Sequence, residues 1–314
     1  MRVNRDADDA VVLVTGASTG LGLALARRLL RTRYRVILTA RESSLPRFAA
    51  ENIRENDRVW IRPLDITSAA ERQRVVDEAD QRRGGIDILV NNAGVAYRAV
   101  VEHITDEGRW DQMNVNYRAP LELIRLVLPG MRRKRDGHII NISSVGGMMA
   151  MPTMALYSAS KFALEGATEA LWYEVRPWNI KVSLVQPGFV HSDSFRRTRF
   201  TESSRRGSDD LANPYHEHYQ HMGRMIARLM QTTHATPDHV ARVVLRTMRR
   251  RDPPLRVAGT WDAGLFGLLR RLLPRRFYHS VLYSRLPRVK VWGGSCEMPP
   301  PADVKPLEQP NSGG

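Results

Sequence analysis

Short runs of Val, Ile and Leu alternate with longer amphipathic runs from residue 11 to about residue 185, and this alternation constrains the fold more than any other feature. We expect the short runs to form strands at residues 11–14, 35–39, 58–62, 86–90, 138–141 and 180–185. We expect the longer runs to form helices at residues 21–30, 68–81, 106–131 and 155–175. Because several strands are apolar along their whole length, helices must cover both faces of the sheet. The sequence therefore predicts an α/β fold with a Rossmann-type, doubly wound parallel sheet.

The alternation ends after residue 187, and the rest of the chain divides by composition. Residues 193–235 are polar and resemble an insertion that forms a lid over a site. A further helix at 237–250 and a short strand near 255–258 complete the predicted domain. We therefore expect a single domain at residues 10–260, with an N-terminal tail at 1–9, a C-terminal extension at 261–298 and a disordered tail at 299–314.

The formal net charge of +15 is concentrated late in the chain. Residues 241–290 contain 13 Lys or Arg against 2 Asp or Glu, and so carry a net charge of +11. The chain holds 43 Arg and only 5 Lys, which indicates a chain-wide bias rather than a nucleic-acid partner. Residues 261–286 mix leucines and aromatics with arginines, a pattern typical of a helix on an anionic bilayer and equally of a helix that covers the protein's own pocket.

Cysteine content and hydropathy bear on the compartment. The single cysteine, Cys296, cannot form an intramolecular disulfide. No run approaches the roughly 18 apolar residues of a membrane span, and the charged start offers no apolar stretch of a secretory signal. We expect a cytoplasmic protein, with membrane association through residues 261–286 as the alternative.

A glycine-rich loop, Thr15-Gly-Ala-Ser-Thr-Gly-Leu-Gly22, follows the first predicted strand and opens a helix. Glycine allows a tight turn and a close approach of the backbone to a ligand. The unpaired N–H groups at the start of the following helix can then hold the diphosphate of a dinucleotide. The residues predicted to form this phosphate-binding cradle are Gly16, Ser18, Thr19, Gly20, Leu21 and Gly22.

The end of the second predicted strand bears on the choice between NAD and NADP. An acid at this position would hold the adenosine ribose of NAD, but the sequence places Ala40 there. Arg41 offers a fork of donors that suits the 2′-phosphate of NADP. Glu42 leaves NAD open as the alternative, because a small shift in register would bring it to the ribose.

Tyr157 and Lys161 are four residues apart at the start of a predicted helix and therefore project from one face. A tyrosine titrates near pH 10, and an adjacent ammonium should lower its pKa enough for acid–base work at neutral pH. Ser144 lies at the end of the fifth predicted strand, at the sheet edge where open α/β sheets place their sites. Ser144 could therefore hold a carbonyl oxygen beside this pair.

These motifs together resemble the classical short-chain dehydrogenase/reductase family over residues 10–190. The matching elements are Thr15 to Gly22, Asp65, Asn91 to Gly94, Ser144 with Tyr157 and Lys161, and Pro187-Gly188, in the family's order and spacing. The resemblance implies that Tyr157 is the general acid and base, that Lys161 lowers its pKa and binds the nicotinamide ribose, and that Ser144 orients the substrate oxygen. It also implies that Asn116, rather than Asn114, is the structural and proton-relay asparagine.

The resemblance also assigns the rest of the cofactor site and the reaction class. It implies hydride transfer between NADP, or NAD, and an alcohol, ketone or aldehyde, in a homodimer or homotetramer. The cofactor residues that it adds to the glycine loop and Arg41 are Asp65, Ile66, Asn92, Ala93, Gly94, Tyr157, Lys161, Pro187, Gly188, Val190 and Ser192.

The substrate side of the predicted site is apolar. Met149 and Met151 lie between Ser144 and Tyr157, where an adaptable wall would suit a lipophilic steroid-, retinoid- or fatty-type substrate. Residues 236–277 resemble the C-terminal part of retinol- and steroid-type members. We expect the histidines at 216, 218 and 221 to belong to a solvated lid and not to a metal site. The alternative function is a non-catalytic relative that senses NADP or binds nucleic acid or a membrane.

Overall fold

Seven parallel strands form the central sheet of the computed structural model, which describes residues 9–192 and 197–293. The strand order is β3-β2-β1-β4-β5-β6-β7, so the order reverses between β1 and β4. The bounds are β1 Val11–Val14, β2 Arg35–Ala40, β3 Val59–Pro63, β4 Ile88–Asn91, β5 Gly137–Ile142, β6 Ile180–Gln186 and β7 Arg256–Ala258. The predicted doubly wound Rossmann-type sheet is confirmed, and the strand ends differ from the predicted ones by one or two residues.

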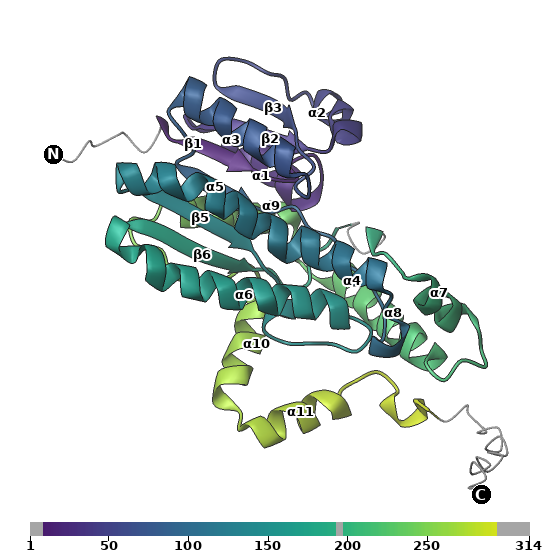
Figure 1. Cartoon of the computed structure of the whole chain (residues 1–314). Helices are drawn as coiled ribbons and strands as arrows, with labels where there is room; N and C mark the ends of the chain where they lie inside the picture. The colour runs from purple at the N-terminus through teal and green to yellow at the C-terminus, as the bar shows by residue number, and fades with distance from the viewer. Residues whose placement is uncertain (1–8, 193–196, 294–314) are drawn as a thin grey trace, which may run out of the picture.

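Helices cover both faces of the sheet (Figure 1). Along β1, Val12 and Val14 point into one apolar core and Val11 and Leu13 into the other, as expected for side chains that alternate between faces. The first core lies under α1 (Gly20–Leu29) and α9 (Pro237–Met248). The second lies under α3 (Ala69–Arg83), α5 (Ala119–Lys134) and α6 (Ala155–Val175). A short helix, α2 (Pro46–Ala50), follows β2.

The single helix predicted at residues 106–131 is wrong, because the structure divides this stretch. α4 (Asp106–Met113) is followed by a π-helical turn at Asn114–Arg118, and only then does α5 begin. The wide turn directs Asn116 inward, where its side chain accepts from Val95 N at 2.9 Å and donates to Val95 O at 2.9 Å. Single π-turns of this kind occur often beside functional sites.

The predicted lid contains helices that the sequence pattern did not predict, and the predicted extension is helical as its pattern indicated. The described part of the predicted lid holds α7 (Glu202–Asp209) and α8 (His216–Thr232), which lie beyond the carboxyl ends of the strands (Figure 1). The described part of the predicted extension holds α10 (Trp261–Leu272) and α11 (Arg275–Ser284), which lie beneath α6 in Figure 1. Residues 1–8 of the predicted N-terminal tail, Cys296 and the predicted disordered tail lie outside the described residues.

The sequence analysis predicted that the histidines of α8 belong to a solvated lid, but the structure buries two of them. His216 and His221 are buried, and His221 pairs with Glu217 at 2.7 Å. The ring of His218 packs against Trp292, with 4.4 Å between the centroids. Within residues 9–192 and 197–293, no group of three or more His, Cys, Asp or Glu side chains could hold a metal ion. These histidines therefore contribute to the packing of α8 against the rest of the protein.

Candidate active site

A cavity of about 840 Å³ opens along the carboxyl ends of the strands. It begins at the loop after β1, passes the ends of β2 to β6 and reaches α8. The order of the strands reverses at β1 and β4, and such a switch point is where open α/β sheets bind their ligands. The volume lies within the range of small-molecule and cofactor sites.

The glycine loop at one end of the cavity is closed by backbone contacts that only glycine allows. A Cβ at Gly22 would lie 2.2 Å from the carbonyl oxygen of Gly16. Gly16 itself has φ +64°, and its Cβ would lie 2.9 Å from the Cα of Ala93. The side chain of Asn92 holds the loop by donating to Thr15 O at 2.9 Å and to Gly16 O at 3.1 Å.

The start of α1 faces this loop without a side-chain cap. Thr19 occupies the N-cap position and makes no capping hydrogen bond, and the first turn of α1 contains no acidic residue. The N–H groups of this turn, together with the positive end of the helix dipole, are therefore available to an anion. The cradle fits the diphosphate of a dinucleotide.

The next part of the cavity carries Arg41, Ser44 and Arg47 on one side and Asp65, Ile66 and Thr67 on the other. Burial would raise the pKa of Asp65, but hydrogen bonds from Thr67 and the charges of Arg41 and Arg72 bring it below its ordinary value. Asp65 is thus an ionised acceptor, suited to the amino group of an adenine. Glu42 is not among the described residues that line the cavity, whereas Arg41 is.

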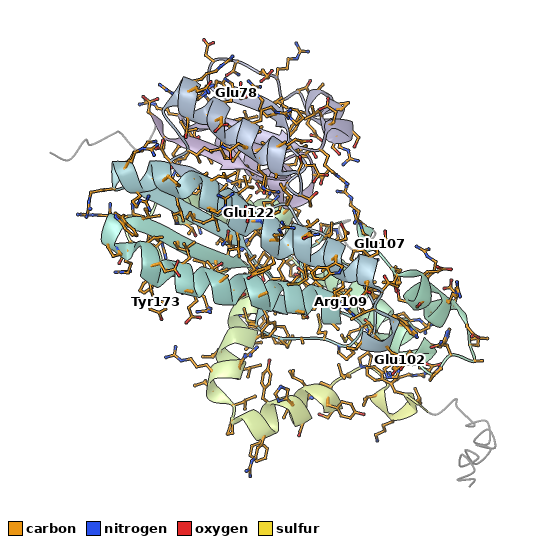
Figure 2. The ribbon with its side chains drawn as sticks, in the orientation of Figure 1. Glu78, Glu102, Glu107, Arg109, Glu122 and Tyr173 are labelled. Atoms are coloured by element: carbon orange, nitrogen blue, oxygen red, sulfur yellow. The ribbon has the colours of Figure 1, made fainter. Side chains whose placement is uncertain are left out.

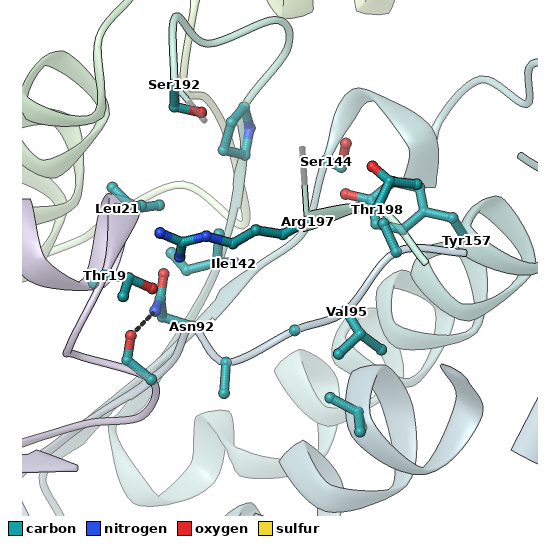
Figure 3. A pocket seen from close by; sticks show the side chains of 18 of the residues that line it. Thr19, Leu21, Asn92, Val95, Ile142, Ser144, Tyr157, Ser192, Arg197 and Thr198 are labelled. Carbon is teal, nitrogen blue, oxygen red and sulfur yellow. Dashed lines mark hydrogen bonds between the residues drawn. The ribbon is translucent and has the colours of Figure 1, made fainter. Parts of the chain in front are cut away.

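Ser144 and Tyr157 lie together at the other end of the cavity (Figure 3), and Lys161 lines the cavity with them. Ser144 lies just after β5, and Tyr157 and Lys161 lie on the first turns of α6. Gly146 lets the phenol ring approach, because a Cβ there would lie 2.8 Å from Cε1 of Tyr157. The Lys161 ammonium donates to the carbonyl oxygen of Ile142 at 2.9 Å. The three side chains thus converge from two elements that the sheet holds rigidly.

The prediction that Lys161 lowers the pKa of Tyr157 is wrong for this structure. Burial raises the pKa of Tyr157, and a hydrogen bond from Ser144 offsets this only in part. The Lys161 nitrogen lies 5.9 Å from the centroid of the phenol ring and is directed to Ile142. Burial also lowers the pKa of Lys161, to about 8. The phenol is therefore fully protonated at neutral pH and can donate a proton.

Asn116 lies behind the catalytic end and does not line the cavity. It is buried, bonds Val95 through both ends of its amide, and donates to the Ser160 hydroxyl at 3.1 Å. The Ser160 hydroxyl in turn donates to the carbonyl oxygen of Tyr157 at 2.7 Å. Asn116 therefore braces the segment after β4 against the turn of α6 that carries the tyrosine.

The structure brings nearly all of the other predicted site residues to this cavity. Met151 lines the cavity, as predicted for a substrate residue. Met149 does not line it and is only 6% exposed, so the prediction of Met149 as a substrate residue is wrong. All the predicted cofactor residues line the cavity, namely Gly16, Ser18, Thr19, Gly20, Leu21, Gly22, Arg41, Asp65, Ile66, Asn92, Ala93, Gly94, Tyr157, Lys161, Pro187, Gly188, Val190 and Ser192.

Several lining residues were not predicted from the sequence. Arg197 extends across the cavity towards Thr19 and Asn92 (Figure 3). Arg98 lies in the segment after β4, and Ile226 and Met230 lie on α8. None of them belongs to a motif, and their position depends on how α8 and the segment before α7 fold back over the sheet. For Arg98 and Arg197, the only signal in the sequence was the large number of arginines, which does not distinguish these two from the others.

Three comparisons with known proteins agree with this geometry. Residues 10–203 match the family described as short chain dehydrogenase. The chain is 34% identical to a 3-ketodihydrosphingosine reductase from Bacteroides thetaiotaomicron over 246 residues, which are 78% of this chain and 86% of that protein. It is 32% identical to retinol dehydrogenase 8 from Bos taurus over 256 residues, which are 78% of this chain and 80% of that protein.

Solved structures give the same result. A short-chain dehydrogenase from Streptomyces avermitilis is 30% identical and superposes with a TM-score of 0.70, covering 88% of this chain and 96% of that one. A short-chain dehydrogenase from Burkholderia cenocepacia in complex with NADP is 25% identical, with a TM-score of 0.66 and coverage of 89% and 98%. The cavity lies at the position that such folds use for a dinucleotide.

Proposed function

Since this chain belongs to the short-chain dehydrogenase/reductase family and is an oxidoreductase that acts on CH–OH or keto groups with NAD or NADP, we propose that it uses NADPH and a lipophilic carbonyl or alcohol. The main support for this proposal is that Ser144, Tyr157 and Lys161 lie together at one end of a cavity whose other end is shaped to bind a diphosphate. The relatives with named activities are a reductase and a dehydrogenase, so a non-catalytic role is not favoured.

The proposed mechanism assigns one task to each side chain. When bound, the nicotinamide supplies or accepts the hydride. Tyr157 donates the proton to the carbonyl oxygen during reduction, which suits a phenol whose pKa is raised by burial. The Ser144 hydroxyl holds the same oxygen. The Lys161 ammonium stabilises the phenolate that remains and binds the nicotinamide ribose. Oxidation needs the phenolate at the start, and we therefore expect it to be favoured at high pH.

The proposed reaction is tested by following NADPH oxidation with a panel of long-chain and cyclic ketones and aldehydes. We expect turnover to increase with the apolar surface of the substrate, because Met151, Met154, Ile226 and Met230 line the catalytic end of the cavity. Absence of NADPH- and NADH-dependent turnover across the panel would contradict the proposal.

The proposed preference for NADPH depends on Arg41. Arg41→Ala should weaken NADPH binding by roughly 10- to 100-fold, the value of a lost charge-assisted hydrogen bond to phosphate. NADH, which has no 2′-phosphate, should bind the variant as it binds the unmodified protein. Fluorescence titration of both cofactors measures the two dissociation constants.

Glu42→Ala is the matched variant for this prediction. Glu42 adjoins Arg41 in the sequence but does not line the cavity in the described structure. The variant should leave both dissociation constants unchanged. A selective loss of NADH binding in Glu42→Ala, or equal losses of NADPH and NADH in Arg41→Ala, would refute the assignment of Arg41.

We further propose that α10 and α11 rest on an anionic bilayer, with the protein otherwise cytoplasmic. Trp261, Leu265, Leu268 and Leu272 lie on one face of α10 and are exposed, as are Phe277 and Val281 on α11. The single acid of residues 261–291, Asp262, accepts from the Phe189 N–H at 2.8 Å, so the arginines around this face are not neutralised by it. None of the helices in the described part of the chain is long and apolar enough to span a membrane.

The membrane proposal predicts binding to vesicles that contain phosphatidylglycerol, with release at high salt. The double variant Leu268→Asp/Leu272→Asp should reduce co-sedimentation at least about tenfold, because it places two charges on the apolar face. Leu211→Asp is the control, since Leu211 is an exposed leucine that lies outside α10 and α11. Equal binding of all three proteins, or no binding of the unmodified protein, would refute the proposal.

A homodimer or homotetramer, common in the family, is proposed to form across the face that carries α4, α5 and α6. Apolar side chains are exposed there, with Trp110 on α4 and Phe162 and Tyr173 on α6. Glu107, Arg109, Glu122 and Tyr173 mark this face in Figure 2. At Phe162 this face adjoins α10, because Cζ of Arg270 lies 5.3 Å from the centroid of the Phe162 ring.

A further inference from the structure

Arg98 is a buried cation that no carboxylate of the described residues neutralises. Its side chain lies at the cavity and is only 6% exposed. Its Nε is buried without a hydrogen-bond partner, and within residues 9–192 and 197–293 its guanidinium makes no ion pair or hydrogen bond. Burial lowers the pKa of Arg98. The guanidinium also carries four N–H donors on Nη1 and Nη2, and these make no hydrogen bond within the described residues.

The backbone around Arg98 is fixed on both sides, which holds the residue at the catalytic end of the cavity. Its N–H donates to the carbonyl oxygen of Arg199 at 2.8 Å. The N–H of the next residue, Ala99, donates to Thr153 O at 2.8 Å, and Ala99 pairs with Met154 in an isolated bridge. Met154 immediately precedes α6 and lies three positions before Tyr157. Arg98 therefore approaches the site from the segment beside the proposed proton donor.

The side chain is directed between α8 and an aromatic ring. A Cβ at Gly223 of α8 would lie 3.1 Å from Nη1 of Arg98, so glycine leaves room for the guanidinium. The Cζ atom lies 5.8 Å from the centroid of Phe200. Ile226 and Met230 follow Gly223 by three and seven residues, on the same face of α8, and line the cavity. The guanidinium therefore lies beside the apolar face that α8 turns to the cavity.

The other charges of the cavity are already accounted for. Asp65 and Asp111 are the acids among the described lining residues. Asp65 lies at the opposite end, and Asp111 pairs with Arg199 and accepts from the Tyr97 hydroxyl at 3.0 Å. Arg41 and Arg47 lie with Asp65, and Arg197 extends towards the glycine loop (Figure 3). Lys161 is directed to the carbonyl oxygen of Ile142 and belongs to the catalytic set. On the substrate side, Arg98 is the guanidinium without a counter-charge among the described lining residues.

We propose that Arg98 binds a carboxylate at the far end of an apolar substrate, so that the substrate class is a lipophilic oxo or hydroxy acid. This inference rests on the proposed reaction and names its substrate more closely. A single unpaired guanidinium matches one monoanion, and its planar fork matches the two oxygens of a carboxylate. The apolar body of the substrate lies along Met151, Met154, Ile226 and Met230, with its carbonyl at Ser144 and Tyr157.

The test measures binding of unreactive probes to the protein with NADPH bound. Dodecanoate and dodecan-1-ol have the same chain and differ in charge, and isothermal titration gives both dissociation constants. We expect dodecanoate to bind about 10- to 100-fold more tightly than the alcohol, the range for a charge-assisted pair in a desolvated site. In Arg98→Met this preference should disappear, while binding of the alcohol is unchanged. Arg98→Lys should keep part of the preference.

A matched variant separates the cavity from general attraction of anions to a basic protein. Arg205 contacts the same ring, with Cζ 5.9 Å from the centroid of Phe200, but is exposed and does not line the cavity. Arg205→Met should keep the full preference for dodecanoate. Equal binding of the two probes by the unmodified protein, a preference that survives in Arg98→Met, or a preference that Arg205→Met also abolishes would overturn the proposal.

Thermal unfolding distinguishes a binding role from a structural one. Arg98→Met removes an unpaired buried charge and replaces it by an apolar chain of similar length, so we expect an equal or higher Tm. A purely structural arginine would instead give a lower Tm. Turnover of 10-oxodecanoate and of its methyl ester supplies the independent check. If the protein prefers dodecanoate over dodecan-1-ol but turns over neither oxo compound, the proposed reaction is refuted. If it turns over both oxo compounds equally and shows no preference for dodecanoate, the role of Arg98 is refuted.

Discussion

Tyr157→Phe is expected to lower kcat for ketone reduction by roughly 1,000-fold, within the range by which general acid–base catalysis accelerates reactions. The substitution removes the hydroxyl that Ser144 contacts and leaves the ring against Gly146. Phenylalanine fills the same space, so the fold and the cofactor site should be unchanged. Steady-state kinetics with NADPH and a ketone substrate give kcat, and fluorescence titration gives the dissociation constant of NADPH.

Tyr173→Phe is the matched control for this variant. Tyr173 (labelled in Figure 2) lies on the same helix, α6, but is 62% exposed and does not line the cavity. It should retain full activity. The assignment of Tyr157 as the proton donor is refuted by a Tyr157→Phe enzyme that keeps full turnover, and equally by one that loses NADPH binding in parallel with activity.

The strand positions and most of the cavity lining were predictable, because both follow from local patterns. A run such as Val11–Val14 is apolar at every position. Such a pattern is typical of a strand that is covered by helices on both faces of the sheet. Once the strands are placed, the carboxyl ends of β1, β4, β5 and β6 must meet at one edge, and the residues directly after them must share a site. The glycine loop, Asn92, Ser144 and Gly188 lie at these ends and reach the same cavity.

The errors arise where a side chain's direction depends on tertiary structure. The helical pattern at 106–131 was continuous, but the hydrogen bonds of Asn116 to Val95 accompany a π-turn that no periodicity reveals. Met149 and Met151 are two residues apart in an irregular segment, and only Met151 faces the cavity. The helical spacing of Tyr157 and Lys161 was correct, but the spacing carries no information on burial, which dominates the pKa of both groups.

Arg98 illustrates the same limit for the substrate. In the sequence it is one of 43 arginines, with no motif to mark it. Only the packing of α8 and Phe200 around it makes it a buried cation, without a counter-charge in the part of the chain that the structure describes. The methionines in the sequence indicated only a lipophilic substrate, whereas Arg98 in the folded cavity supports our proposal of a lipophile with one acidic end.

Gly22→Ala is expected to abolish tight NADPH binding, with a loss of more than about 100-fold, and to destabilise the protein by roughly 3 kcal/mol, the upper part of the usual range for overpacking. The added methyl would lie 2.2 Å from the Gly16 carbonyl oxygen and 2.6 Å from Nδ2 of Asn92. Because both neighbours belong to the cradle, the loop must open to relieve the contact, and the Asn92 hydrogen bonds to Thr15 and Gly16 would be broken. Thermal unfolding with and without saturating NADPH measures both effects.

Gly166→Ala is the matched substitution, because Gly166 is exposed on α6 and a Cβ there meets nothing within 4 Å. Alanine favours a helix by up to about 1 kcal/mol over glycine, so this variant should be slightly more stable than the unmodified protein and should bind NADPH normally. Adding NADPH should raise the Tm of Gly166→Ala as it raises that of the unmodified protein, and should leave the Tm of Gly22→Ala unchanged, since a ligand stabilises only the state that it binds. A Gly22→Ala protein that NADPH stabilises as strongly as Gly166→Ala would mean that the cofactor does not lie against this loop.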